Sequence, residues 1–373
     1  MVDDTDTIIV GAGPAGLAVA AALRRRNLAF AILERNDTIA SSWRSHYERL
    51  HLHTPKNHSA LPFMTFPRAF PRYPSRDQVI EYLQDYARHF DLVPHLQTDV
   101  LCCTRTADAG WEVQSSRGTY CARHLVVASG YSRVPHRPSW PGLENFAGPV
   151  LHSSGYSSGR RFRGQTVLVV GFGNSGAEIA LDLAECGAQS AVAVRGAVNV
   201  IPRDILGVPA IDVALAGRFL PPRIFDWLSA VAIRLAIGDL SRLAIRKRDV
   251  GPAVEILKYG QVPVIDVGTV AAIRSGTIGV RPAIAAFARD EVRFVDGTSG
   301  RFDAIVLATG YHTGLRALFA DATGVLDAGG RPQASGREAA AGLYFCGFHV
   351  VPTGLLREIA IEAVRIGNQI ASS

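Results

Sequence analysis

The chain has 373 residues, of which 48% are apolar and 19% charged, so it has the composition of a globular protein with enough core for about two domains. The net charge of +6 comes from Lys and Arg residues scattered along the chain, which argues against nucleic-acid binding and suits anionic cofactors and substrates. The five cysteines form no Cys-x-x-Cys pair, and Arg and Pro interrupt the longest apolar region (208–238), so we expect no disulfide framework, no dithiol centre and no transmembrane segment.

The chain opens with MVDDTDTIIV, an acidic start that enters a strand at once, so we expect no signal peptide and a cytoplasmic location. A buried strand over 7–10 leads into a Gly-x-Gly-x-x-Gly turn and a helix to about residue 25. Such a turn lets a pyrophosphate approach the backbone and the N–H groups at the helix N-terminus. The next strand, 30–33, ends at Glu34, whose carboxylate can bind a ribose 2′-hydroxyl. The pattern predicts a site for FAD or NAD formed by Gly11, Gly13, Pro14, Ala15 and Gly16.

A second copy of this pattern follows, with a strand over 166–170, another Gly-x-Gly-x-x-Gly turn and a helix to about residue 186. Its next strand, 191–194, ends at Arg195, at nearly the same offset as Glu34 but with the opposite charge. An arginine can bind the 2′-phosphate of NADPH, which a carboxylate would repel; a solvated charge at a strand end is the alternative. Two such sites indicate hydride transfer from NADPH to a bound FAD. The expected contacts of NADPH are Gly171, Gly173, Asn174, Ser175 and Gly176.

The segments between these units show how the chain is organised. The stretch 36–76 is rich in His, Pro and Arg and is too long for an ordinary loop, so we expect it to be functional; a helix over 77–90 and strands near 102–104, 111–114 and 125–128 follow. RHLVVASGY and FDAIVLATGY are typical of a chain that leaves one nucleotide domain and re-enters it, and a closing helix spans about 355–370. The expected fold is α/β, with two Rossmann-like dinucleotide-binding domains in a glutathione-reductase-like arrangement. Residues 1–158 and 311–373 form the FAD-binding domain and residues 159–310 the NADPH-binding domain.

Long phrases of the sequence resemble the flavin-containing monooxygenases, and within them most closely the YUCCA type. The phrases that carry the resemblance are IASSWRSHYERLHLHTPKNHSALPFMTFPRAFPRYPSRDQVIEYLQDYARHFDL, VGFGNSGAEIALDL, AVRGAVNVIPRDILG and GQVPVIDVGTVAAIRSGTIGV. The resemblance implies that NADPH reduces FAD and that the reduced flavin adds oxygen at C4a to give a peroxyflavin. It also implies the substrate of the YUCCA type, the 2-oxo acid indole-3-pyruvate, which is oxidatively decarboxylated.

The identifying motif of the family, F-x-G-x-x-x-H-x-x-x-(Y/F)-(K/R), is present with one departure. It reads Phe146, Gly148, His152 and Tyr156, and then Ser157 in place of the basic residue. The departure leaves phosphate binding at this position without its usual cation, although Arg160 and Arg161 follow closely.

The resemblance also implies roles for residues around the flavin. Aligned on LHLHTPK, His53 lies near the reactive edge of the flavin, where it could donate a hydrogen bond; packing against FAD is the alternative. Trp43 is expected against the flavin, and Arg35 at the FAD phosphate or adenine, with core packing and a surface charge as the alternatives. The further residues expected to contact the cofactors are Arg44, Thr54, Val100, Thr309 and Gly310.

The substrate implied by the resemblance needs a cation for its carboxylate and an apolar wall for its aryl group. Candidates for the cation are Arg203 and Lys258, and candidates for the wall are Phe66, Phe225 and Trp227. The leading hypothesis is an NADPH- and FAD-dependent monooxygenase that uses molecular oxygen on a small aryl 2-oxo acid.

Other functions are also compatible with parts of the sequence. One alternative is a monooxygenase that oxygenates the nitrogen of a small amine or the sulfur of a thioether. A second is a disulfide reductase, which the absence of a Cys-x-x-Cys pair argues against, and a third is a non-catalytic NADPH sensor. No metal site is expected. A homodimer is among the expected assemblies, and the region 208–238 is interpreted as a substrate-channel cover, a dimer contact or a weak membrane contact.

Overall fold

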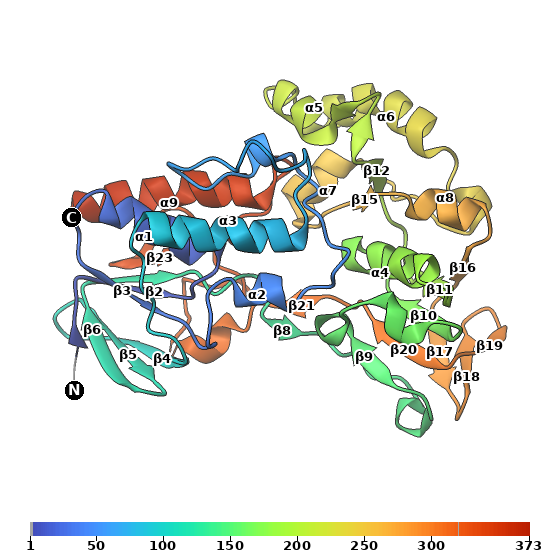
Figure 1. Ribbon diagram of the computed structural model, residues 1–373, viewed down its shortest axis with the longest axis horizontal. Coiled ribbons are helices and arrows are strands. Elements are labelled where there is room, and N and C mark those ends of the chain that lie inside the picture. Colours follow the sequence, from blue (N-terminus) through green and yellow to red (C-terminus); the bar gives the residue numbers. More distant parts are fainter. Residues whose placement is uncertain (1–2, 320) are drawn as a thin grey trace.

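The computed structural model describes residues 3–319 and 321–373, which form two lobes side by side (Figure 1). Each lobe is built on a five-stranded sheet. In each lobe one central strand of the sheet is followed along the chain by a glycine turn and a helix. Both chain ends lie in the first lobe, on the side away from the second lobe (Figure 1). The chain therefore leaves the first lobe, forms the second and returns to the first.

The sheet of the first lobe is parallel except at one edge, where β22 runs antiparallel to β23. Its strands are, in spatial order, β22 (Glu338–Ala340), β23 (Leu343–Phe345), β7 (His124–Val127), β2 (Thr7–Val10) and β3 (Phe30–Leu33). One face packs on three helices, which are α1 (Pro14–Arg24), α3 (Arg76–His89) and α9 (Leu355–Ala371). The other face packs on an antiparallel meander of β4 (Val100–Arg105), β5 (Trp111–Ser115) and β6 (Gly118–Ala122), beside which lies β1 (Asp3–Asp4).

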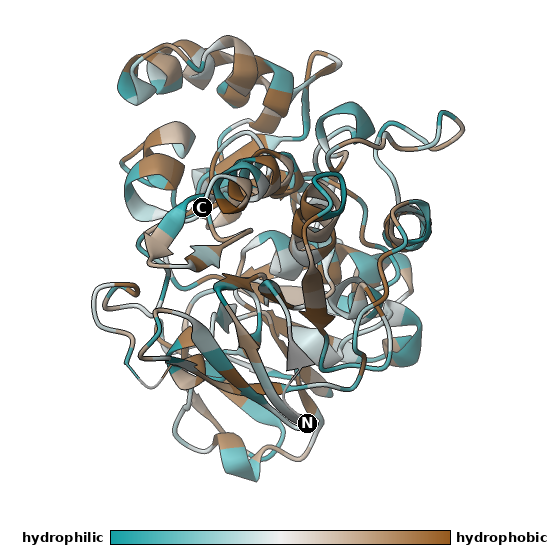
Figure 2. Cartoon of the chain, turned by 90° about the vertical axis from the view of Figure 1, so that its left-hand side faces the viewer, coloured by the Kyte–Doolittle hydropathy of each residue, from teal (hydrophilic) through white to brown (hydrophobic). Residues whose placement is uncertain are grey.

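The second lobe repeats this architecture. Its sheet is parallel throughout and contains β16 (Ile278–Arg281), β11 (Gln189–Ala193), β10 (Thr166–Val170), β20 (Ala304–Leu307) and β9 (Val150–His152). One face packs on α4 (Asn174–Glu185) and α8 (Thr269–Arg274). The other face packs on a meander of β17 (Ile284–Phe287), β18 (Glu291–Phe294) and β19 (Ser299–Arg301). Figure 2 shows the apolar strands and helices, in brown, at the centre of the molecule.

The position of β9 differs from the boundary that the sequence placed near residue 158. Strand β9 pairs in parallel with β20, with Val150 opposite Ile305, so residues 150–152 supply the edge strand of the second sheet. The chain crosses from the first sheet to the second just before this strand, where β8 (Val134–Pro135) pairs with β21 (Tyr311–His312). The change of sheet therefore occurs before residue 150. The sequence did not indicate this boundary, because an edge strand of three residues carries too little pattern.

A mostly helical insertion lies above the second sheet in Figure 1. Its elements are β12 (Val200–Pro202), β13 (Asp204–Ile205), β14 (Val208–Pro209), α5 (Ala210–Ala216), α6 (Pro222–Ile237), α7 (Pro252–Tyr259) and β15 (Val264–Asp266). Strand β12 pairs with β15, which connects this insertion to the start of α4. Within the described residues, no helix combines the length and apolar character needed to cross a membrane.

Candidate active site

The first glycine turn leaves an open cradle at the N-terminus of α1. Gly11 has a φ of +105°, which side chains other than glycine rarely adopt, and a Cβ on Gly16 would lie 1.8 Å from the carbonyl oxygen of Gly11. A Cβ on Gly13, in contrast, would meet no heavy atom within 4 Å. The helix starts there without a side-chain cap, so no side chain caps its first N–H groups. The turn is shaped to admit a phosphate group, which is what a bound dinucleotide requires.

Glu34 lies at the end of β3, beside this cradle, and is buried. Its Oε2 accepts a hydrogen bond from the backbone N–H of Ala12 (2.8 Å), while Oε1 accepts from the backbone and side chain of Asn36 (3.0 and 2.8 Å). An ionised carboxylate offers about four acceptor positions. Oε2 can therefore still accept a hydrogen bond from a ribose hydroxyl. Of the other predicted contacts, Arg35 is exposed, and Val100 is buried in the core at the start of β4.

The second glycine turn has the same geometry. Gly171 has a φ of +107°, a Cβ on Gly176 would lie 2.1 Å from the carbonyl oxygen of Gly171, and the Cβ position of Gly173 is open. Arg195 is exposed beyond the end of β11 and, within the described residues, makes no ion pair. Its guanidinium is therefore free to bind a phosphate. Asn174 is engaged within the protein, because its side chain donates to the carbonyl of Pro263 (3.2 Å) and accepts from the N–H of Ile265 (2.7 Å).

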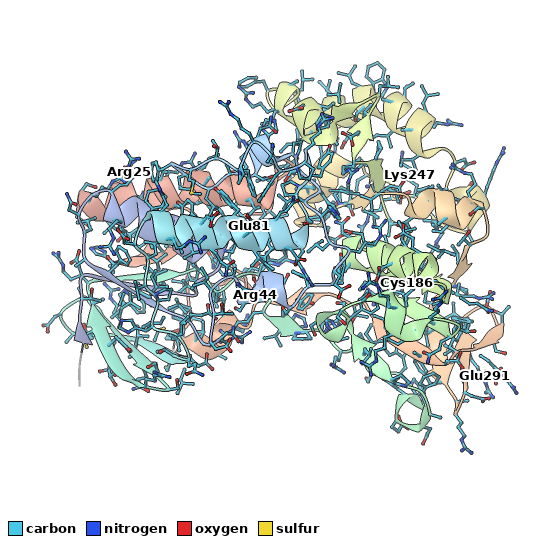
Figure 3. The ribbon with its side chains drawn as sticks, in the orientation of Figure 1. Arg25, Arg44, Glu81, Cys186, Lys247 and Glu291 are labelled. Carbon is cyan, nitrogen blue, oxygen red and sulfur yellow. The ribbon has the colours of Figure 1, made fainter. Side chains whose placement is uncertain are left out.

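The segment 36–76 connects the two lobes. Arg49 donates to Glu185 of α4 (2.7 Å) and lies 4.0 Å from Glu178 of the same helix. His58 contacts Asp212 of α5 at 2.6 Å, and Tyr73 donates to Asp204 of β13 at 2.5 Å. The segment that was expected to be functional therefore provides polar contacts to both α4 and the insertion. It includes the short helix α2 (Ser41–Arg44), and Figure 3 shows Arg44 near the boundary between the lobes.

His53 is the centre of a buried polar cluster in this segment. Its Nε2 lies 2.6 Å from Oε1 of Glu178, which is 2% exposed and lies on α4 just after the second glycine turn. Because an ionised carboxylate can only accept, this contact places the proton of the imidazole on Nε2. Burial and the nearby charge and hydrogen bond of Glu178 raise the pKa of Tyr47 well above its ordinary value, so this phenol stays protonated. Within the described residues the Nδ1 of His53 has no hydrogen-bond partner, so it is available to a ligand.

Arg203 lies close to the segment that carries His53. Its guanidinium is centred 4.1 Å from the ring of Tyr73, and its Nε lies 3.5 Å from Asp204. Two backbone hydrogen bonds join the stretches 51–56 and 72–75: the N–H of Leu52 donates to the carbonyl of Pro74, and the N–H of Lys56 donates to the carbonyl of Arg72. Tyr73 therefore lies alongside His53 and Thr54. The Nε of Arg203 is buried and has no hydrogen-bond partner among the described residues.

The other substrate candidates are placed less favourably. Lys258 is exposed on α7, and no hydrogen bond or ion pair of the described residues joins it to His53. Phe66 stacks on Tyr82 at 3.9 Å within the core of the first lobe, which accounts for it as a packing residue. Phe225 is half-buried on α6 against Gly217, whereas Trp227 is exposed on the outer side of that helix.

Comparison with known proteins identifies the chain. Residues 8–204 match the family model described as pyridine nucleotide-disulphide oxidoreductase. Indole-3-pyruvate monooxygenase YUCCA6 of Arabidopsis thaliana is 44% identical over 316 residues, which covers 82% of this chain and 76% of that protein. The rice protein indole-3-pyruvate monooxygenase YUCCA1 is 41% identical over 319 residues, covering 84% of this chain and 79% of that protein. The chain belongs to the YUCCA-type flavin-containing monooxygenases. It is an NADPH- and FAD-dependent monooxygenase.

Solved structures show that the chain has the α/β fold of flavoprotein monooxygenases. A flavin-containing monooxygenase from Stenotrophomonas maltophilia superposes with a TM-score of 0.74 at 22% identity, covering 100% of this chain and 99% of that chain. A steroid monooxygenase bound to NADP superposes with a TM-score of 0.79 at 18% identity, covering 99% of this chain and 86% of that chain. At these identities the likeness concerns the fold.

The identifying motif of the monooxygenase family has a structural basis in this chain. A Cβ on Gly148 would lie 2.2 Å from the carbonyl oxygen of Asp303, so only glycine allows the approach of β9 to β20. His152 is buried and contacts the carbonyl of Gly310 at 3.1 Å, which holds the crossing between the lobes. Tyr156 donates to Asp182 of α4 at 2.6 Å. These motif residues position the strands and α4 rather than line an open site.

The remaining predicted residues lie at this crossing or in the first lobe. Thr309 donates to the carbonyl of His136, and Gly310 adopts a φ of +87°. Trp43 is half-buried against the core of the first lobe, and its ring makes an edge contact with His46. Thr54 contacts Ser59 through its hydroxyl at 2.7 Å.

Sequence reasoning missed Glu178, Asp182 and Tyr47. The signal for the first two was present in NSGAEIALDL. This helix is otherwise apolar, and its two acidic residues are four positions apart, so both point into the protein and need hydrogen-bond donors. Tyr47 lies in an irregular segment, where no periodicity indicates which side chains are buried.

Proposed function

We propose that this monooxygenase oxidatively decarboxylates an aryl 2-oxo acid such as indole-3-pyruvate. The names of its YUCCA relatives support this substrate class, since they are indole-3-pyruvate monooxygenases at 37–44% identity over most of the chain. The observation that carries the proposal is His53, which is held by Glu178 with its Nδ1 free, next to the segment that Arg203 contacts.

We propose that FAD occupies the first cradle and NADPH the second, in a glutathione-reductase-like arrangement of the two lobes. Glu34 then binds the ribose of FAD and Arg195 the 2′-phosphate of NADPH. The FAD-binding domain comprises residues 1–158 and 311–373 except for strand β9, and the NADPH-binding domain comprises residues 159–310 together with that strand. This assignment follows the opposite charges at the ends of β3 and β11.

The protein residues have three tasks in the proposed reaction. Bound FAD supplies oxygen activation once NADPH has reduced it, and the surrounding protein must orient the substrate and exclude water. Arg203 binds the carboxylate of the 2-oxo acid through its guanidinium, whose Nε has no hydrogen-bond partner among the described residues. His53 holds or moves a proton at Nδ1 while the C2 carbonyl is attacked, and Glu178 fixes the orientation of its ring. The 2-oxo acid, O₂, NADPH and a proton yield the shortened acid, CO₂, NADP⁺ and water.

The proposed function is tested with the purified flavin-loaded enzyme, NADPH, oxygen and indole-3-pyruvate. We expect indole-3-acetate and CO₂ in equal amounts to the NADPH consumed, with one oxygen atom from ¹⁸O₂ in the carboxylate of the product. A small amine and a thioether are run in parallel. Oxygenation of either one, without turnover of the 2-oxo acid, would assign the enzyme to heteroatom oxygenation instead.

We further propose that the enzyme acts in the cytoplasm and forms a homodimer. The first proposal follows from the demand for NADPH. The second places the two-fold contact on a surface other than helix α6, because the exposed Arg223 and Arg234 of two copies would repel each other there. Cell fractionation tests the location, and light scattering coupled to gel filtration tests the dimer. A monomeric mass at all concentrations would contradict the second proposal.

A further inference from the structure

Helix α6 exposes an apolar stripe to solvent. Five side chains of the stripe recur at helical spacing along one side of α6, and a sixth, Phe219, lies just before the helix. The five are Ile224, Trp227, Leu228, Val231 and Leu235. Trp227 is 74% exposed and Leu235 is 82% exposed, whereas amphipathic helices of globular proteins usually turn such side chains inward. The helix lies at the edge of the molecule (Figure 1), and its brown segments in Figure 2 lie at the periphery as well. Such a patch indicates an interaction surface.

The segment that carries the stripe is rich in cations. Residues 218–247 contain six Lys and Arg residues against two Asp residues, a net charge of +4 out of +6 for the whole chain. All six cations are exposed, and they are Arg218, Arg223, Arg234, Arg242, Arg246 and Lys247. Figure 3 shows Lys247 on the same side of the second lobe as α6. The single carboxylate of α6, Asp226, is occupied, because it accepts hydrogen bonds from the N–H groups of Ala253 and Val254 at the start of α7.

We propose that α6 docks the enzyme on the surface of an anionic lipid bilayer. The helix would lie in the interface with its apolar stripe in the headgroup region and its arginines on the lipid phosphates. Trp and Arg are the side chains that suit this boundary, since each combines an apolar part with a polar or charged end. Docking through α6 does not depend on the substrate of the enzyme, so it can be tested separately from the proposed function.

Charge favours a lipid surface over a second copy of the chain as the occupant of the stripe. A two-fold contact centred on α6 would bring the same surface of both copies together. Arg223 and Arg234 would then approach their own counterparts, and Asp226 would not be free to pair with them. An anionic bilayer instead supplies a compensating charge to each arginine.

The proposal is tested by flotation of the flavin-loaded enzyme with vesicles that contain about one third phosphatidylglycerol in phosphatidylcholine. We expect binding to the anionic vesicles, weaker binding to pure phosphatidylcholine, and loss of binding at high salt. Tryptophan emission should shift to the blue on binding, and Trp227→Ala should abolish that shift. Replacing Arg223 and Arg234 together with Gln should weaken binding by about tenfold or more.

A matched pair of variants separates the stripe from general surface effects. Val231 on α6 is 66% exposed, and Val295 in the meander of the second lobe is 64% exposed. Val231→Asp should weaken vesicle binding by at least about tenfold, and Val295→Asp should leave it unchanged. Equal effects of the two variants, or no vesicle binding by the parent enzyme, would overturn the proposal. So would a dimer that Val231→Asp dissociates while vesicles remain unbound, because the occupant would then be a second copy.

Discussion

The contact between His53 and Glu178 allows a direct test of the site. We consider the variant Glu178→Gln, which keeps the shape of the side chain and a carbonyl oxygen that can still accept from Nε2 of His53. What the variant removes is the negative charge. Glu178 is 2% exposed and lies 2.6 Å from the imidazole, so water screens the contact little.

The magnitude follows from the burial of this hydrogen bond. A hydrogen bond to a charged group contributes about 1.5–3 kcal/mol, and about 1.4 kcal/mol corresponds to tenfold in a rate or equilibrium constant. If the charge serves to hold His53 during oxygen transfer, its removal should slow product formation by about 10–100-fold. Reduction of the flavin by NADPH should change much less, because the hydrogen bond that the variant weakens joins Glu178 to His53 and not to the glycine turn.

The assay separates these two half-reactions. Anaerobic stopped-flow measurements follow flavin reduction by NADPH, and product analysis in air follows oxygen transfer to the 2-oxo acid. The ratio of hydrogen peroxide to product reports how much of the activated oxygen is lost. We expect the variant to consume NADPH, release more hydrogen peroxide and form less product, with a melting temperature only a few degrees below that of the parent.

Glu185→Gln is the matched control. Glu185 lies on the same helix, is half-exposed, and pairs with Arg49 of the same segment, so its loss also removes one contact between the lobes. Because exposed pairs contribute at most about 1 kcal/mol, this variant should stay within about fivefold of the parent. If Glu178→Gln retained full product formation and low peroxide release, the positioning role of Glu178 would be refuted. If both variants slowed both half-reactions equally, the contacts would serve only to join the lobes.

Three further predictions follow from the structure. Arg195→Ser should raise KM for NADPH by about 10–100-fold and leave KM for NADH nearly unchanged, which steady-state kinetics measures. Burial lowers the pKa of His46, His124 and His152 below the usual 6.5. The unfolded chain therefore binds more protons just below that pH, and urea denaturation should show stability that falls as pH drops from about 7 to 5. A flat profile would contradict the prediction. Burial raises the pKa of Cys103 to about 12, so mass spectrometry should find it unalkylated by iodoacetamide at about pH 8 in the folded enzyme.

The regular elements of the fold could be predicted closely because they follow apolar periodicity. The helix expected over 77–90 is α3 (Arg76–His89), and its start is set by a capping box between Ser75 and Gln78. The strand expected over 166–170 is β10 with the same limits. Strand β9 was missed because three residues carry too little pattern, and its place in the second sheet depends on pairing with β20, which is distant in sequence.

The candidate site could be predicted only where a local pattern determines the chemistry. The glycine turns, Glu34 and Arg195 are such cases, since strand, turn and helix place them without reference to the rest of the chain. Their positions agree with the structure, and their cofactor contacts stay predictions. The partner of His53 could not be found in this way, because Glu178 is 125 residues away and meets it only after the lobes pack. The side-chain contacts of Asn174 with Pro263 and Ile265 could not be found either, and its contact with a cofactor stays a prediction.

The duplicated helices show where the two lobes diverge. Gly16 and Gly176 occupy equivalent places, so Ala18 and Ala22 of α1 correspond to positions 178 and 182 of α4. In the first lobe this face is apolar and covered by α9, where a Cβ on Gly367 would lie 3.0 Å from the Cβ of Ala22. Small side chains are required there because two helices approach closely.

In the second lobe the same face carries Glu178 and Asp182, and irregular segments with the short 3-10 helix Gly159–Phe162 cover it instead of a long helix. Glu178 receives His53 from the first lobe, and Asp182 receives Tyr156 from the family motif. Two buried carboxylates without partners would destabilise α4, so the helix can pack only when these segments are in place. Glu178 therefore makes docking of the segment 36–76 a condition for stable packing of α4, and His53 acquires its orientation from that docking. Replacing both acids with Ala, as in the first copy, should remove this condition and leave His53 without a fixed orientation.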